Sequence, residues 1–445
     1  MNDVISVFGL GKLGCTMLAC FAHKGWHVIG MDINENFVNK INNGDAPIYE
    51  PGVDALIKKN RDKIKATTDS KYAVDNSNIS FVIVPTPSLK DGSFSTKYVE
   101  AVIAEIGSIL RSKNDYHLIV ITSTVLPGDM EYIVKLLEKT SSKKCNEHFG
   151  VCYNPDFIAL GSIIKNFLNP DMILIGESDK KAGLTLTNIH NHLVDNKPNI
   201  HRMNFYNAEL SKISLNAYCT LKITFANVLA EICEQMPGGD AGIVSNAIGD
   251  DVRIGRVYLK GGLSYGGPCF PRDNRAFAHS ARKLGVTNYL ASKTDEINDY
   301  HRNERIPNKI IEILREKNVK EIAILGLTYK KDTTLIEESA SISITKALSI
   351  KGIIVTVYDP AGLEEARDEF DNQNNINIAK SISSCINGKS VCFIATPWDE
   401  FTLLTSDYFL SKMKNPTILD SWGLFNFKNV EEIDYREIGK EGNLE

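Results

Sequence analysis

The sequence lacks the features that would place the chain in a membrane or on a nucleic acid. No apolar run approaches the roughly 20 residues that cross a bilayer, and no basic stripe accompanies the net charge of −5. The apolar start has no basic residues before it and leads directly into glycines, so it predicts a strand and not a signal peptide. We therefore expect neither a membrane nor a nucleic acid among the partners.

The cysteines also lack a pattern. There are 9, an odd number, and none belongs to a Cys-x-x-Cys pair, which argues against a disulfide framework and against a structural zinc site. We expect no metal, and a reducing cytoplasm as the location. The length of 445 residues, with 43% hydrophobic and 24% charged residues, is typical of a globular protein with two or three domains.

The start of the chain carries a dinucleotide-binding pattern. A β-branched run, 4–8, precedes the glycines of G-x-G-x-x-G at Gly9, Gly11 and Gly14, and an apolar helical pattern follows them. Asp32 ends the next strand near the spacing of about 20 residues at which an acid meets the adenosine ribose. A chance glycine turn is the alternative. Because Asp32 would repel a 2′-phosphate, we expect NAD and not NADP.

Two later strands of the same region end in threonines. Strand 80–84 is followed by Pro-Thr86-Pro, and strand 118–121 by Thr-Ser-Thr124. The carboxyl ends of strands are where open α/β sheets bind ligands, although simple strand-end capping explains both residues equally well. The residues expected to hold NAD are Gly9, Gly11, Lys12, Leu13, Gly14, Asp32, Thr86 and Thr124.

A long helix follows in the middle of the chain. Segment 207–234 contains no Gly or Pro, and its spacing places Glu209, Lys212 and Asn216 on one face. The helix is apolar nearly all round, so we expect it to be buried, and a buried Lys and Asn need a partner or a function. A solvated face with a Glu–Lys pair is the alternative.

The segment 265–273, Tyr-Gly-Gly-Pro-Cys-Phe-Pro-Arg-Asp, is expected to be a stiff loop that holds the Cys269 thiol in a set place. Taken alone this is weak evidence, because a lone cysteine is more often a small buried apolar residue. Helices are predicted at 275–283 and 292–305, and Pro307 should break the second and begin a third that runs to about 314.

The last third of the chain repeats the first in outline. Segments 321–327, 351–359 and 390–397 echo the first strand, residues 24–32 and residues 80–87. We therefore predict an α/β fold with two Rossmann-like doubly wound lobes joined by a helical central domain. The second lobe lacks the complete glycine motif and should bind something other than a dinucleotide. The charged tail after Glu431 should fray. The expected domains are 1–203 for NAD, 204–305 for the helical centre and 306–445 for the second ligand.

Together the motifs resemble the UDP-glucose/GDP-mannose dehydrogenase family, the NAD-dependent nucleotide-sugar 6-dehydrogenases. The resemblance covers nearly the whole chain, in the expected order. Besides the opening glycines it rests on segments 47–52 (Pro-Ile-Tyr-Glu-Pro-Gly), 84–87, 123–128, 153–155, 209–216 (Glu-x-x-Lys-x-x-x-Asn), 253–255, 265–273 and 326–330 (Gly-Leu-Thr-Tyr-Lys).

The resemblance implies a four-electron oxidation of a sugar C6 alcohol to a carboxylate. Cys269 would form a thiohemiacetal and then a thioester, because a thiol is already partly ionised near neutral pH. Lys212 would favour the thiolate and, with Asn216, steady the oxyanion. Asp273 would serve as base or would orient water. Thr124 resembles the active-site threonine, and Asp156 is the further catalytic candidate.

The resemblance also implies how substrate and partner are bound. Arg253 resembles the arginine that reaches the substrate of a neighbouring subunit, so we expect a homodimer or higher homo-oligomer packed through the middle helices. Lys330 resembles the lysine that contacts the nucleotide sugar from the last domain. The expected substrate-binding residues are Lys212, Asn216, Arg253, Tyr258, Gly266 and Lys330.

Several positions depart from the family pattern. Asp156 replaces a glutamate, Ala159 and Leu160 replace an Arg-Glu pair, and Glu337 and Trp422 stand where arginines are usual. UDP-glucose, as in polysaccharide biosynthesis, is the expected substrate, with GDP-mannose or a UDP-N-acetylhexosamine as alternatives. Two alternatives have a different function. One is a two-electron sugar or hydroxy-acid dehydrogenase, which would not need Cys269. The other is an NAD-binding protein without catalysis.

Overall fold

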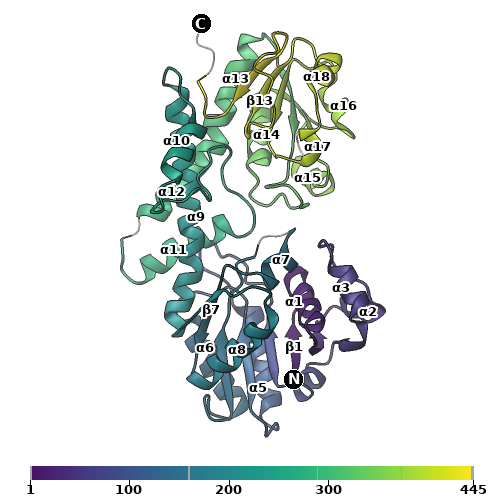
Figure 1. The fold of residues 1–445 in the computed structure, drawn as a ribbon, viewed down its shortest axis with the longest axis vertical. Coiled ribbons are helices and arrows are strands. Elements are labelled where there is room, and N and C mark those ends of the chain that lie inside the picture. The colour runs from purple at the N-terminus through teal and green to yellow at the C-terminus, as the bar shows by residue number, and fades with distance from the viewer. Residues whose placement is uncertain (1–2, 159–160, 288, 372, 442–445) are drawn as a thin grey trace. The chain divides into compact units, whose positions relative to one another are not determined.

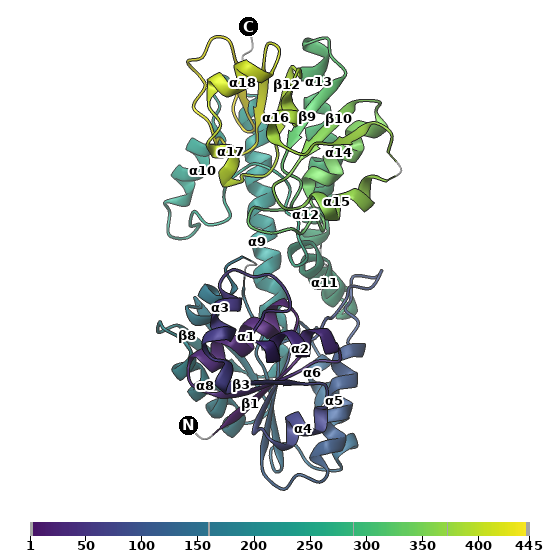
Figure 2. The same cartoon turned by 90° about the vertical axis from the view of Figure 1, so that its right-hand side faces the viewer.

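The computed structural model describes residues 3–158, 161–287, 289–371 and 373–441. Its contacts divide the chain into two compact units, Met1–Ser214 and Leu215–Glu445. Each unit contains one twisted sheet with helices on both faces (Figures 1 and 2). The predicted fold class, two doubly wound lobes and a helical centre, is confirmed.

The first unit is built on a sheet of 8 strands in the order β3-β2-β1-β4-β5-β6-β7-β8. All neighbours are parallel except β6 and β7, which are antiparallel, so the sheet is mixed. Its central strands are short runs of buried residues, as a sheet covered on both faces requires. They are β1 (Val4–Phe8), β2 (His27–Met31), β3 (Ile64–Thr67), β4 (Ile79–Val82), β5 (His117–Ile121), β6 (Phe149–Tyr153), β7 (Met172–Glu177) and β8 (Asn199–Met203).

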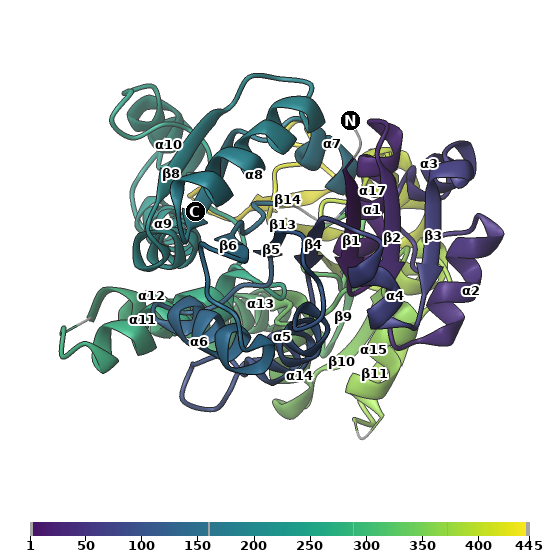
Figure 3. The ribbon, with the colours of Figure 1, turned by 90° about the horizontal axis from the view of Figure 1, so that it is seen from below.

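Helices cover both faces of this sheet, and each face has its own apolar core. Side chains of α1, α7 and α8 pack in one core, and those of α4, α5 and α6 in the other (Figure 3). The helices are α1 (Lys12–His23), α2 (Glu35–Asn43), α3 (Val53–Lys59), η1 (Arg61–Lys63), α4 (Ser70–Asp75), α5 (Lys97–Leu110), α6 (Asp129–Ser141), α7 (Ile163–Leu168) and α8 (Lys180–Leu193).

The second unit contains a wholly parallel sheet of 6 strands in the order β11-β10-β9-β12-β13-β14. Cores formed by α13–α15 and by α16–α18 cover its two faces. The strands are β9 (Glu321–Leu325), β10 (Ile354–Tyr358), β11 (Ile376–Ile378), β12 (Val391–Ile394), β13 (Thr417–Asp420) and β14 (Asp434–Glu437). The helices are α10 (Ala241–Gly249), α11 (Phe270–Lys283), α12 (Tyr289–Tyr300), η2 (His301–Arg305), α13 (Ile306–Glu316), α14 (Ala340–Ile350), α15 (Leu363–Phe370), α16 (Ile382–Ile386), α17 (Asp399–Thr402) and α18 (Ser406–Lys412).

The long middle helix is α9 (Phe205–Glu234). The Asn204 side chain caps it by accepting a hydrogen bond from Asn207 N at 2.9 Å. The expectation that α9 is buried is only partly right. Tyr218, Phe225 and Ile232 are 59%, 49% and 49% exposed, and their seven-residue spacing aligns them along one side of the helix.

Two local predictions are wrong. The tail does not fray at Glu431, because β14 joins the sheet edge and Ile438 is buried. Gly439 N then donates to the Glu234 carboxylate at 2.8 Å. Nor does Pro307 break the helical path. It lies in the first turn of α13, where its missing N–H costs nothing, and the π-helical turn η2 leads into it from α12.

Candidate active site

The glycine turn after β1 is shaped for a dinucleotide. Gly9 has φ +97°, and a Cβ there would lie 2.4 Å from Ile83 O. A Cβ on Gly14 would lie 1.8 Å from Gly9 O, whereas one on Gly11 would meet nothing within 4 Å. Open space therefore lies beside the start of α1, and the N-terminus of a helix is a ready site for an anion such as a pyrophosphate. Lys12 and Leu13, in this first turn, are partly exposed.

The other predicted cofactor residues lie at the ends of neighbouring strands. The partly exposed Asp32 carboxylate accepts hydrogen bonds from Leu10 N at 2.6 Å and Asn34 N at 2.9 Å, so it is fixed and still accessible to a ribose. Thr86 Oγ1 donates to Thr124 O at 2.9 Å. The structure thus brings Thr86 and Thr124 together after β4 and β5, as the sequence indicated.

Lys212 and Asp156 also meet in the first unit. Lys212 Nζ donates to the backbone O of Asp156 at 2.7 Å and lies 4.6 Å from the centre of the Phe157 ring. Burial raises the pKa of the Asp156 carboxyl to about 7, and the Lys212 ammonium limits the rise. Asp156 Oδ2 is buried with no hydrogen-bond partner among the described residues. This carboxyl is suited to exchange a proton near neutral pH.

Glu209 has a structural partner. Its carboxylate is buried and accepts hydrogen bonds from Gly128 N at 2.9 Å and Met130 N at 2.8 Å, at the first turn of α6. Burial raises its pKa to about 7, while the two N–H groups oppose the rise. Glu209 therefore fixes α6 against α9, and this accounts for its place on the buried face beside Lys212.

Cys269 differs from every other cysteine. Among the 9 cysteines, all of which lie in the described ranges, it alone is exposed. By contrast, burial raises the pKa of Cys15 and of Cys20 to about 12, which keeps those thiols protonated. Cys269 occupies the N-cap position of α11. The positive end of a helix dipole stabilises a thiolate at such a position.

Asp273 and Asn216 accompany the thiol in the second unit. Asp273 N donates to Cys269 O at 2.8 Å, one turn into α11, and the Asp273 carboxylate is fully buried. Its oxygens accept hydrogen bonds from Asn216 Nδ2 at 2.6 Å and Arg272 Nε at 3.0 Å. One N–H of the Asn216 amide is therefore committed to Asp273.

Three predicted substrate residues lie in or against segment 265–269, here called the thiol loop; the prediction that this loop extends to Asp273 is wrong, because Phe270–Asp273 form the first turn of α11. The Tyr258 ring packs edge-on against Phe270, with centroids 5.6 Å apart. A Cβ on Gly266 would lie 2.3 Å from Glu338 O, and one on Gly267 would lie 2.5 Å from the Tyr329 ring. Tyr329 precedes Lys330, so the Lys330 turn packs directly on the thiol loop.

Arg253 and the positions that depart from the family pattern have contacts of their own. The guanidinium of Arg253 is 84% exposed and pairs with Asp251 at 2.6 Å. Glu337 accepts a hydrogen bond from Gly267 N through its backbone O. Trp422 donates from Nε1 to Ala395 O at 2.9 Å. Two further departures from the family pattern, Ala159 and Leu160, lie outside the described residues.

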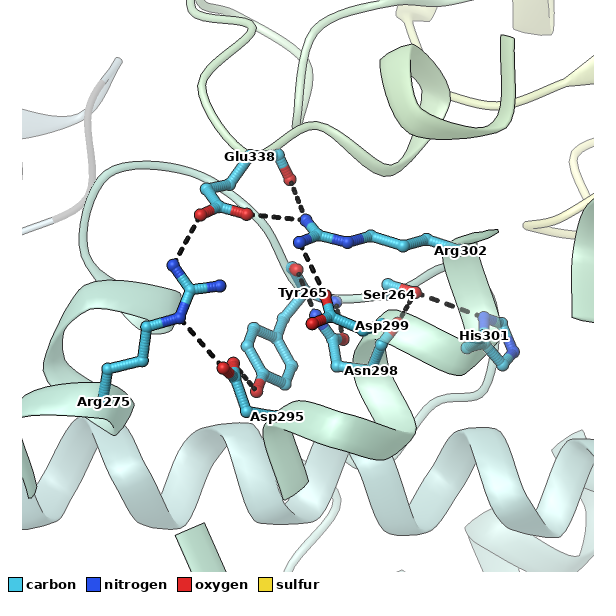
Figure 4. Close-up of polar contacts among 9 residues, drawn as sticks. All are labelled: Ser264, Tyr265, Arg275, Asp295, Asn298, Asp299, His301, Arg302 and Glu338. Atoms are coloured by element: carbon cyan, nitrogen blue, oxygen red, sulfur yellow. Dashed lines mark hydrogen bonds and ion pairs between the residues drawn. The ribbon is translucent and has the colours of Figure 1, made fainter. Parts of the chain in front are cut away.

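Sequence reasoning missed several polar residues around the thiol loop. Arg275, Asp295, Arg302 and Glu338 form a connected group beside Tyr265 (Figure 4). They are far apart in the sequence. The available signals were the glutamate of the family pattern in segment 333–339, which Glu338 matches, and Arg275, which lies close to the predicted Asp273.

Within the described residues no three His, Cys, Asp or Glu side chains are grouped closely enough to hold a metal ion. None of the helices in the described ranges has the length and apolarity to cross a membrane.

Comparison with known proteins extends this geometry. Models of the UDP-glucose/GDP-mannose dehydrogenase family match residues 3–194 (NAD binding domain), 206–300 (central domain) and 323–427 (UDP binding domain). UDP-glucose 6-dehydrogenase of Haloferax volcanii is 33% identical, over 98% of this chain and 99% of the relative. GDP-mannose 6-dehydrogenase of Pseudomonas aeruginosa is 34% identical, over 84% of each chain. The UDP-glucose dehydrogenase structure from Pyrobaculum islandicum superimposes with a TM-score of 0.86 at 28% identity, covering 99% of this chain and 98% of that one.

Proposed function

Because the chain belongs to the UDP-glucose/GDP-mannose dehydrogenase family, we propose that it oxidises the C6 hydroxyl of UDP-glucose to a carboxylate through a covalent adduct on Cys269. The family assignment makes it an NAD-dependent nucleotide-sugar 6-dehydrogenase. The identity of the sugar and the role of Cys269 are the parts that belong to the proposal.

The cofactor is NAD. The chemistry that bound NAD supplies is acceptance of a hydride in each of the two oxidations. The N–H groups at the start of α1 would hold its pyrophosphate, and the space beside Gly11 admits that group. Asp32 would accept hydrogen bonds from the ribose hydroxyls.

The thiol of Cys269 acts after the first oxidation. Its sulfur adds to C6 of the aldehyde, and the former carbonyl oxygen becomes the hydroxyl of a thiohemiacetal. Loss of a second hydride and of the hydroxyl proton gives a thioester. Water then breaks the C–S bond, which releases the carboxylate and restores the thiol.

Five side chains are proposed to move protons or hold oxygens around these steps. Asp273, fixed by Asn216 and Arg272, orients the water that cleaves the thioester. The second N–H of Asn216 and the Lys212 ammonium stabilise the negative oxygen of the tetrahedral adduct. Asp156, whose pKa burial raises to about 7, exchanges the proton of the C6 hydroxyl. Thr124, which follows β5, is the other side chain proposed for these roles.

The observation that carries the proposal is the placement of Cys269. It is the exposed cysteine of the chain, it stands at a helix N-terminus, and Asp273 and Tyr258 adjoin its loop. A two-electron dehydrogenase would have no use for this arrangement.

Lys330 supports a nucleotide sugar as the second ligand, because its turn packs on the thiol loop. We propose three domains: residues 1–203 bind NAD, residues 204–305 carry the thiol, and residues 306–445 bind the nucleotide sugar. GDP-mannose is the second candidate, since the relative named for that sugar is 34% identical. Glu337 and Trp422 replace cationic side chains and are the positions to exchange if UDP-glucose is not used.

We also propose that two copies associate through α9. The exposed stripe of Tyr218, Phe225 and Ile232 supports this, because such a row of large apolar side chains on one helix is typical of an interface. Val252, beside Arg253, is 97% exposed. This segment would reach the second copy.

A substrate panel tests the function. Wild-type protein is mixed with NAD and, separately, UDP-glucose, GDP-mannose and UDP-N-acetylmannosamine, and NADH and product mass are followed together. We expect two NADH and one carboxylate for each UDP-glucose. Turnover of GDP-mannose alone would replace the substrate assignment, and no turnover on any nucleotide sugar would refute the function.

A further inference from the structure

We propose that Glu338 is a positioning residue that sets the place of the Cys269 thiol relative to the turn bearing Lys330. The inference rests on the proposed function, because it concerns how the same thiol is presented. Glu338 acts through the two segments that carry Cys269 and Lys330.

The backbone of Glu338 holds the thiol loop from one side. The loop can approach because Gly266 and Gly267 have no side chains: a Cβ on Gly266 would lie 2.3 Å from Glu338 O. Gly267 N donates to the neighbouring Glu337 O at 2.9 Å. Cys269 follows within two residues of this contact, so a shift of Glu338 moves the thiol.

The carboxylate of Glu338 bridges two arginines from different helical segments. Oε1 accepts a hydrogen bond from Arg275 Nη1 at 2.7 Å, and Oε2 accepts one from Arg302 Nη1 at 2.7 Å (Figure 4). Arg275 lies on α11, the helix that Cys269 caps, and Arg302 lies in the π-helical turn η2. One side chain thus connects the thiol helix to a turn of the kind often found at functional sites.

The two arginines are themselves held. Arg275 Nε donates to Asp295 Oδ2 at 2.9 Å, and the Tyr265 hydroxyl donates to the other oxygen of Asp295 at 3.1 Å. Arg302 Nη2 pairs with Asp299 at 2.7 Å, and only 10% of its side chain is exposed. Tyr265 begins the thiol loop. These contacts therefore connect the thiol loop, α12, α11 and Glu338 to one another in a closed ring.

The backbone at Glu338 indicates that its side chain is needed there. Its φ is +52°, a conformation that costs a glutamate about 1 kcal/mol or more and that glycine adopts freely. If the segment served only as a connection before α14, glycine would fit it better. A strained residue with two fixed ion pairs is typical of a site where geometry matters more than stability.

Glu338→Gln tests the proposal, because it keeps the shape and removes the charge shared by the two arginines. We expect the rate of carboxylate formation to fall about 10- to 100-fold, the loss typical of a misplaced reacting group, with the KM for NAD unchanged. Aldehyde that escapes capture should be trapped with hydroxylamine, so NADH per sugar should fall from two towards one. Glu338→Asp, which retains the charge on a shorter side chain, should recover part of the rate.

A second readout does not depend on the substrate. Alkylation of Cys269 by iodoacetamide, followed by peptide mass spectrometry, should be at least about threefold faster in Glu338→Gln because the loop opens more often. Glu437→Gln is the matched control: Glu437 pairs with Lys440 at 2.6 Å in the same unit, away from the thiol loop, and its loss should change neither rate.

The outcomes separate the two proposals. If the wild type oxidises no nucleotide sugar, the proposed function fails, and the alkylation rates still decide the role of Glu338. If Glu338→Gln melts earlier but alkylation, NADH per sugar and turnover match the wild type, the residue only stabilises the fold and the inference is wrong. Should Glu338→Gln fail to fold, Arg275→Lys, which keeps the charge and loses the two-sided contact, replaces it with the same expected direction.

Discussion

The two lobes share a first strand followed by a glycine turn, but they differ in where the next helix begins. In each, a glycine with positive φ follows the first strand, Gly9 at +97° and Gly326 at +101°, and an acid ends the second strand. In the first lobe α1 starts three residues after the glycine. In the second, the next helix is α14, which starts only at Ala340. A helix N-terminus at the turn is what holds a pyrophosphate, so the first lobe has the geometry of a dinucleotide site.

The acids show the same contrast. Asp32 is partly exposed and accepts two backbone hydrogen bonds. Asp359 is 1% exposed and is saturated by local donors, including the Trp398 indole at 3.1 Å. The first acid is held ready for a ligand, whereas the second holds its own loop together. Equal positions in a repeated fold therefore do not imply equal functions.

The largest expected effect distinguishes these acids. Asp359→Ala should lower the free energy of unfolding by about 3–5 kcal/mol, because buried backbone N–H groups of Leu327, Thr328, Ala361 and Gly362 lose their acceptor. Asp32→Ala should cost roughly 1 kcal/mol of stability and should instead weaken NAD binding. Urea denaturation and NAD titration of both variants test this difference between the two acids. Equal losses of stability in the two variants would contradict it.

Asp156 in the first lobe should make stability depend on pH in the range below and up to neutral pH. Burial raises the pKa of Asp156 from 3.8 to about 7, so its stabilising contribution is complete below pH 4 and is lost as the pH rises through 7. Against Asp156→Asn, the wild type should therefore lose up to about 1.4 kcal/mol per pH unit between pH 5 and pH 7. A constant difference in the free energy of unfolding between the two proteins, measured at pH 5, 6, 7 and 8, would contradict this.

Glu338 in the second unit should behave in the opposite sense. Burial raises the pKa of its carboxyl, but the ion pairs with Arg275 and Arg302 outweigh burial and lower it below 4.5. Its contribution is present above that pH and is lost in acid.

The smallest expected effect concerns the glycine turn. Gly11→Ala should leave the melting temperature unchanged, since a Cβ there meets nothing within 4 Å, and should raise the Kd for NAD about tenfold by filling the pyrophosphate space. Gly326→Ala gives the comparison in the second lobe at the counterpart of Gly9, where a Cβ would lie 2.5 Å from Thr396 N. It should lower stability and leave NAD affinity unchanged. The reverse pattern would place the dinucleotide in the second lobe.

Local patterns predicted much of this molecule. The strands, the glycine turn and Asp32 follow from short-range signals, and the spacing of Lys212 and Asn216 correctly predicted two buried residues with polar partners. The ordered tail, the π-helical turn and the ion pairs of Glu338 could not be predicted in this way. Each depends on contacts between segments distant in the sequence, such as Gly439 with Glu234.

The roles of individual side chains were the least accessible part. Glu209 was expected on the same face of α9 as Lys212 and Asn216, but its carboxylate accepts hydrogen bonds at the first turn of α6. Trp422 stands where the family pattern has a cation, and its indole is bonded to a backbone oxygen of its own lobe. Residue type and spacing identify candidates, and only their partners separate a structural role from a chemical one.

The most direct test of the account is NADH and carboxylate yield from UDP-glucose, measured side by side for wild type and Cys269→Ser. We predict two NADH and one carboxylate per sugar for the wild type. Cys269→Ser should form no net carboxylate while keeping the wild-type affinity for NAD. Full carboxylate yield from Cys269→Ser would contradict the thioester route and, with it, the role assigned to the thiol loop.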